Sequence, residues 1–235
     1  MSCQGDVDLK VTVLFSGGKD SCLATWYAIH QGWKITSLLV MIPPSADSYM
    51  FHYPAVKWAH LQGEAIGIPA TSSAAPSGKS AELEDLQTSL SILKNQGVDG
   101  LVSGAVASGY QKRKIDAICE TLGIISYAPL WNKDPELLLK ETLDLGFETY
   151  VAGVSALGFD ESWLGRRIDE KTISELKSIH RKTGIHLSGE GGEYETFVTD
   201  ACFFGKRIEL TRTSKRWTGS SGHLIIEDAK LSSKR

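Results

Sequence analysis

Short apolar runs alternate with longer segments of helical spacing through the first half of the chain. Five runs are predicted strands, at residues 10–15, 35–41, 68–71, 100–103 and 124–127. Four segments between them predict helices, at residues 20–31, 55–66, 83–95 and 111–122. Strands joined by helical crossovers predict a parallel sheet covered on both faces. We therefore expect an α/β fold with a doubly wound, parallel, five-stranded sheet.

The pattern changes after Pro129. A predicted helix at 135–145 and strand at 148–155 lead into a helix-rich stretch, a Gly- and Glu-rich turn, and strand character at 203–210 and 223–226. This predicts a nucleotide-binding domain at residues 1–130 and a smaller C-terminal α+β subdomain at 131–235, which we expect to bind the substrate. The small, polar stretch TSSAAPSGKSAE at 71–82 is expected to be a mobile loop.

Composition and charge narrow the class of protein. The chain has 235 residues, of which 42% are hydrophobic and 23% charged, so it is not disordered or fibrous. The formal net charge of −3 gives no overall field for a polyanion, and we expect no nucleic-acid partner. The longest apolar run, 38–42, is far shorter than the roughly 20 residues that span a bilayer, so we expect no membrane contact. Four cysteines without Cys-x-x-Cys spacing predict a cytoplasmic protein.

The motif SGGKDS lies directly between the first predicted strand and the first helix. Its glycines allow a tight turn with exposed amides, the helix start favours an anion, and the lysine adds a positive charge. A phosphate cradle is the predicted function, with Asp20 as a Mg²⁺ ligand. An ordinary Gly-Gly turn with an Asp or Ser helix cap is the alternative. The residues of the cradle are Ser16, Gly17, Gly18, Lys19, Asp20 and Ser21.

The fourth predicted strand adds a second group of candidates. Its end carries the small residues Ser103, Gly104 and Ala105, which leave room for a ribose and an adenine or simply allow close packing. The cations of the YQKRK segment stand at a helix start, where they oppose the helix dipole unless an anion is near. We therefore expect Gln111 and Lys112 to face the nucleotide, although an exposed basic helix start explains them almost as well.

Three carboxylates gather around a Gly-Gly pair in the C-terminal region. Glu190, Glu193 and Glu195 flank Gly191 and Gly192, and their mutual repulsion favours a cationic partner. A solvated acidic turn is the alternative.

Five segments together resemble one family. SGGKDS resembles the PP-loop of the ATP pyrophosphatases, which belong to the adenine nucleotide alpha hydrolase-like folds. MFHYP (50–54), ELEDL (82–86), SGAVASGYQKRKID (103–116), LGIISYAPLW (122–131) and GEGGEYETFVTDA (189–201) resemble the diphthine-ammonia ligase (diphthamide synthase) family. The resemblance implies ATP-dependent amidation of the diphthine carboxylate on translation elongation factor 2. It implies ammonium as the nitrogen donor, an acyl-adenylate intermediate, and diphthamide, AMP and pyrophosphate as products.

The resemblance also implies roles for the candidate residues. Lys19 and Asp20 act on the ATP phosphates with Mg²⁺, and the three glutamates act in catalysis, with Glu193 the first choice to hold ammonium and act as general base. Tyr194 or Trp131 faces the trimethylammonium group of diphthine, and Gly191, Gly192 and His52 contact the substrate. Free ammonium is expected because residue 2 is serine and Cys3 is internal, so no amino-terminal cysteine offers a glutaminase nucleophile.

Two other functions compete with this one. A PP-loop enzyme that modifies tRNA is less favoured, because thiolation usually needs cysteine pairs and the chain is acidic. A non-catalytic nucleotide-binding module would keep the glycines but would not need Lys19, Asp20 or the acidic turn.

Overall fold

The computed structural model describes residues 9–42, 58–74 and 79–234. The N-terminal part forms a five-stranded, all-parallel sheet in the order β3-β2-β1-β4-β5. Its strands are β1 (Lys10–Leu14), β2 (Lys34–Ile42), β3 (Ala70–Ala74), β4 (Gly100–Val102) and β5 (Ile125–Tyr127). The predicted doubly wound α/β fold is confirmed.

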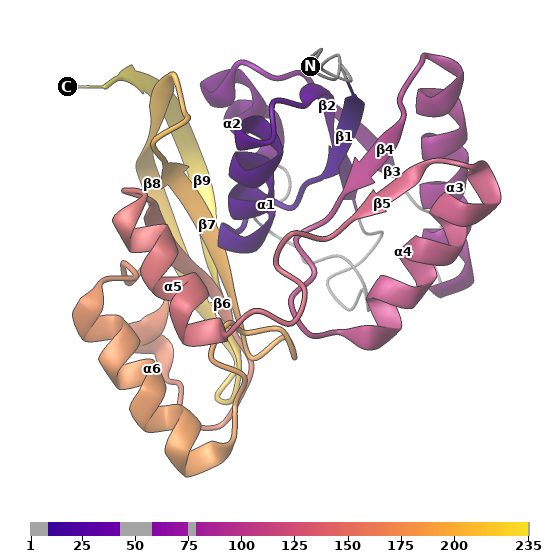
Figure 1. Ribbon diagram of the computed structural model, residues 1–235. Coiled ribbons are helices and arrows are strands. Elements are labelled where there is room, and N and C mark those ends of the chain that lie inside the picture. The colour runs from indigo at the N-terminus through magenta and orange to yellow at the C-terminus, as the bar shows by residue number, and fades with distance from the viewer. Residues whose placement is uncertain (1–8, 43–57, 75–78, 235) are drawn as a thin grey trace, which may run out of the picture.

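Two pairs of helices cover this sheet, one pair on each face (Figure 1). They are α1 (Lys19–His30) and α2 (Ala59–Ile66) on one face, and α3 (Lys79–Asn95) and α4 (Gly109–Leu122) on the other. Neighbouring residues of β2 point to opposite faces, so Leu38 packs with α1 and α2, whereas Leu39 packs with α3 and α4.

The C-terminal part contains a separate antiparallel sheet in the order β7-β6-β9-β8. Its strands are β6 (Glu148–Val154), β7 (Tyr194–Asp200), β8 (Lys206–Trp217) and β9 (Gly222–Ser233). Helices α5 (Pro135–Asp144) and α6 (Glu170–Thr183) and the 3-10 helix η2 (Glu161–Trp163) complete this part. The expected α+β subdomain is therefore present.

The two sheets share one hydrophobic core. Helices α1 and α2 lie between them, so that the first sheet, these helices and the second sheet form successive layers (Figure 1). Val13 of β1 and Leu23 of α1 belong to the same buried cluster as Phe197 of β7 and Ile226 of β9. The second sheet therefore covers the helices that position the SGGKDS turn.

The expected loop at 71–82 is wrong at both of its ends. Residues Thr71 to Ala74 belong to β3, because β2 supplies parallel partners from Leu39 to Ile42 for their backbone groups. Helix α3 begins at Lys79, before the predicted start at residue 83, and Leu86 and Leu90 farther along it are buried against the sheet. Residues 75–78 lie outside the described part of the chain.

Across the described ranges, no helix is both long enough and apolar enough to cross a membrane.

Candidate functional site

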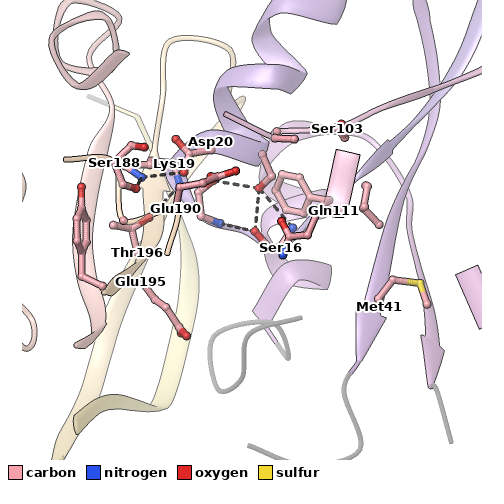
Figure 2. Close-up of a pocket in the computed structure, with 18 of the residues that line it drawn as sticks. Ser16, Lys19, Asp20, Met41, Ser103, Gln111, Ser188, Glu190, Glu195 and Thr196 are labelled. Carbon is pink, nitrogen blue, oxygen red and sulfur yellow. Dashed lines mark hydrogen bonds and ion pairs between the residues drawn. The ribbon is translucent and has the colours of Figure 1, made fainter. Parts of the chain in front are cut away.

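A cavity of about 190 Å³ opens beside the SGGKDS turn (Figure 2). It lies at the carboxyl ends of β1 and β4, which are neighbours at the point where the strand order reverses. Ligands of open α/β sheets bind at such a point. Twelve of the predicted site residues line it: Ser16, Gly18, Lys19, Asp20, Ser21, Ser103, Gly104, Ala105, Gln111, Glu190, Tyr194 and Glu195.

The SGGKDS turn is closed by its own serines. The Ser21 hydroxyl donates to the carbonyl of Gly18 at 3.0 Å and accepts the amide of Ser16 at 3.3 Å. Gly17 has a φ of +79°, and a Cβ there would lie only 2.1 Å from Gln62 Oε1. The turn therefore requires glycine at position 17 both for its backbone conformation and for space.

Lys19 forms a buried ion pair at one side of the cavity. Its ammonium lies 2.7 Å from Asp20 Oδ2, donates to the carbonyl of Ser188 at 2.5 Å, and faces the Tyr194 ring at 5.2 Å from its centre. Burial by itself would lower the pKa of Lys19, but the charge of Asp20 and its hydrogen bond to the ammonium act in the opposite direction, and the pKa is raised. Lys19 therefore remains an ammonium at neutral pH. Burial also raises the pKa of Asp20, although the neighbouring ammonium opposes this.

The aromatic ring of Tyr194 packs against the lysine of this ion pair. Its hydroxyl donates to the carbonyl of Leu187 at 2.6 Å, and its side chain is almost completely buried. Burial raises the pKa of Tyr194 to about 12, with Lys19 acting in the opposite direction. The face of the Tyr194 ring is occupied by Lys19 of the same chain.

The small residues after β4 allow close packing. A Cβ on Gly104 would lie 2.8 Å from the amide nitrogen of Ser21, at the start of α1. The glycine therefore brings the β4 end against the first turn of α1, as the packing alternative expects for this position.

Glu190 joins the acidic turn to the loop before α4. Its Oε1 accepts the backbone amides of Val106, Ala107 and Ser108 at 3.0 to 3.1 Å. One carboxylate oxygen thus satisfies three consecutive donors from a segment more than 80 positions away. This contact holds the wall of the cavity that carries Ala105.

Glu193 folds back onto the turn that contains it. Its two carboxylate oxygens accept the amides of His186 and Gly191, at 2.7 and 2.8 Å. Glu193 does not line the cavity, whereas Glu195 on β7 does. Among the three glutamates, the carboxylates thus have different surroundings.

Among the residues that the structure describes, the remaining predicted ones do not line the cavity. Gly17 is in the turn, and Gly191 and Gly192 shape the acidic turn. Lys112 bonds Asp116 at 2.5 Å and lies 5.6 Å from the centre of the Trp131 ring, so these two residues contact each other. His52 is outside the described residues.

Sequence reasoning missed three polar residues that complete the site. Thr196 Oγ1 accepts the Lys19 amide at 3.0 Å, and the Ser188 carbonyl accepts the Lys19 ammonium. The fully buried Gln62 amide donates to the carbonyls of Gly17 and Val198, both at 2.8 Å. A glutamine on the apolar face of a predicted helix is a signal that could have identified Gln62. Ser188 lies just before the acidic turn and Thr196 just after it. The sequence pattern there predicted a turn but not the strand β7.

The donors present suit Mg²⁺ only together with phosphate oxygens. Within the described ranges, no group of three or more His, Cys, Asp or Glu side chains is arranged to hold a metal ion. Mg²⁺ commonly binds through one or two carboxylates and the phosphates of its substrate. Asp20, on the cavity wall, fits that arrangement.

Comparisons with known proteins identify the family. Two family models match, described as the diphthamide synthase N-terminal domain over residues 9–126 and the diphthamide synthase C-terminal domain over residues 134–232. The chain is 32% identical over 220 residues to the human protein named diphthine--ammonia ligase, covering 85% of this chain and 82% of the relative. It is 32% identical over 225 residues to the protein of the same name from Danio rerio, covering 87% and 88%. These matches span most of both chains, so the chain belongs to the diphthamide synthase family.

Proposed function

We propose that this chain is an AMP-forming carbon–nitrogen ligase that uses ATP and ammonium to amidate the diphthine carboxylate on translation elongation factor 2. The observation that carries the proposal is the single cavity formed by the SGGKDS turn and the acidic turn, which are about 170 positions apart. The names of the relatives supply the substrate class. The shared cavity supports a site at which ATP and a cationic substrate would bind next to each other.

The first half-reaction is proposed to occur against the SGGKDS turn. There the β and γ phosphates of ATP would contact the turn amides and Lys19, while the substrate carboxylate attacks the α phosphorus and pyrophosphate leaves. Asp20 would hold Mg²⁺, which neutralises phosphate charge when bound. Lys19 is held by Asp20 and Ser188, so these two partners set its position for the phosphates.

The second half-reaction needs a base for ammonium. Glu190 and Glu195 both line the cavity, but Glu190 accepts three backbone amides there, and Glu193 accepts two in its own turn. We therefore propose that Glu193 organises the acidic turn and that Glu195, in its place, handles ammonium. Trp131 remains a proposed partner of the trimethylammonium group, which would have to displace the Lys112 ammonium that faces its ring.

The test is a complete reaction with elongation factor 2 that carries diphthine. We expect diphthamide by mass spectrometry, with AMP and pyrophosphate in equal amounts. Lys19→Ala and Asp20→Ala should each reduce turnover by roughly 100-fold or more, because stabilisation of phosphoryl charge is a large catalytic contribution. Stoichiometric ADP and phosphate would contradict adenylation, and an unmodified substrate with the unchanged enzyme would contradict the proposal as a whole.

A further inference from the structure

Strand pairing places Gly153 between two polar residues of the second sheet. On β6, Gly153 pairs with Glu195 of β7 on one side and with His223 of β9 on the other. Directly paired residues of antiparallel strands project from the same face of a sheet. Glu195 and His223 therefore share the face on which Glu195 lines the cavity.

The missing side chain of Gly153 lets these two residues converge. A Cβ on Gly153 would lie 3.0 Å from His223 Nδ1 and 3.3 Å from Glu195 Oε2. The backbone of Gly153 is not in the left-handed region, so its conformation does not require glycine. The glycine is needed here for the space above β6.

The Nδ1 atom of His223 lies next to this space above Gly153. His223 Nδ1 is buried, and it has no hydrogen-bond partner within the part of the chain that the structure describes. A buried polar atom without a hydrogen-bond partner is destabilising, because it has lost its bonds to water and gained none. A carboxylate across an open space is a suitable partner, and a change of the Glu195 rotamer would bring its oxygen toward the ring.

We propose that His223 is a positioning residue that acts through Glu195. In the working complex, the Nδ1–H of His223 donates to one carboxylate oxygen of Glu195 across the space above Gly153. The other carboxylate oxygen then faces the cavity and receives ammonium. This inference rests on the proposed function, because it specifies how that reaction obtains ammonia.

Amide formation from ammonium and the acyl-adenylate requires the loss of two protons from nitrogen and the departure of AMP. Ammonium gives one proton to Glu195 and becomes ammonia, whose lone pair attacks the acyl carbon of the adenylate. The new C–N bond forms, the bond between that carbon and the phosphate oxygen breaks, and AMP leaves with the electron pair. The nitrogen then loses a second proton to solvent, leaving the neutral amide. His223 holds Glu195 in place and exchanges no atom with the substrate.

The test compares two nucleophiles in the variant His223→Gln. Hydroxylamine is largely unprotonated at neutral pH, so it attacks an acyl-adenylate without first losing a proton to a base. We expect amide formation from ammonium to fall roughly tenfold, with a higher KM for ammonium. Hydroxamate formation and ATP–pyrophosphate exchange should stay within about twofold of the parent. A merely structural role for His223 would lower all three together.

A second variant removes the space and leaves both side chains in place. Gly153→Ala puts a methyl group between His223 and Glu195 and should reproduce the selective loss of ammonium use. His30→Gln, on an exposed residue in the last turn of α1, and Gly205→Ala, where a Cβ meets only the Ala65 carbonyl at 3.5 Å, are the matched controls. Both controls should behave like the parent.

Unchanged ammonium kinetics in His223→Gln would overturn the inference, as would an equal loss with both nucleophiles. These results are distinct from a failure of the proposed function, in which the parent enzyme itself would form neither amide nor hydroxamate.

Discussion

Three glutamates of one short motif have three different surroundings. Glu190 lines the cavity and accepts amides of the loop before α4, Glu193 accepts amides of its own turn, and Glu195 lines the cavity from β7. Carboxylate lone pairs that already accept backbone amides are not available to bind ammonium. The hydrogen bonds therefore favour positioning roles for Glu190 and Glu193.

The three amide hydrogen bonds of Glu190 predict a small effect for one substitution at this position and a large effect for another. Glu190→Gln keeps a carbonyl oxygen for the three amides, so ATP–pyrophosphate exchange should remain within about fivefold of the parent. Glu190→Ala leaves those donors without their acceptor and should reduce exchange by roughly tenfold or more. If Glu190 were instead a catalytic base, the glutamine variant would be as inactive as the alanine variant.

At the scale of single elements, the SGGKDS turn depends on a fit between a glycine and a helix. Gly17→Ala should abolish ATP-dependent pyrophosphate release, because the new Cβ would meet the buried Gln62 at 2.1 Å and displace the turn. Gly32→Ala is a matched control, since Gly32 also has a positive φ, of +74°, but has open space around its Cβ position. That control should lose about 1 kcal/mol of stability and keep its turnover. Full activity of Gly17→Ala would show that the turn tolerates the displacement.

Helix α6 offers a prediction about pH, because Asp169 caps it. Its carboxylate accepts the amide of Thr172 at 2.7 Å, and this hydrogen bond lowers the pKa of Asp169. A lowered pKa means that the cap stabilises the fold at neutral pH and that this contribution is lost as the pH falls through the folded-state pKa.

Asp169→Ala should therefore unfold more readily by about 1 kcal/mol at pH 7. The difference from the parent should shrink below roughly pH 4, as the parent carboxyl becomes protonated. Urea unfolding at several pH values measures it, and Ser174→Ala, an exposed position of the same helix, is the control. A difference that stays constant down to pH 2 would contradict the capping explanation.

At the scale of the whole molecule, the two sheets depend on each other. Phe197 and Val198 of β7 are fully buried in the same core as α1, and Thr196 accepts the Lys19 amide. A fragment of residues 1–130 would expose this apolar surface and lose the wall that β7 gives to the proposed nucleotide cavity.

We therefore expect the 1–130 fragment to aggregate or to bind ATP at least tenfold more weakly than the full chain. Calorimetric titration with ATP, together with light scattering, measures both properties. A monomeric fragment with the affinity of the full chain would show that the second sheet is dispensable for nucleotide binding.

Local patterns in the sequence were sufficient for the first sheet and for the SGGKDS turn. The five strands, the crossovers and a Gly-Gly turn before a helix each depend on neighbours within a few residues, where periodicity and backbone freedom act directly. Both ends of the 71–82 stretch were predicted wrongly, because its strand and its helix depend on partners elsewhere, in β2 and in the sheet.

Only the tertiary structure decided which chemical groups meet. The sequence by itself determined the fold class, the Gly-Gly turn before the first helix and the presence of an acidic turn. The fold decided that Ser188 and Thr196 hold Lys19, that Glu190 caps a distant loop, and that Gly153 leaves space beside Glu195. These contacts join residues 40 or more positions apart, and their geometry follows from strand pairing and a shared core, which no local periodicity specifies.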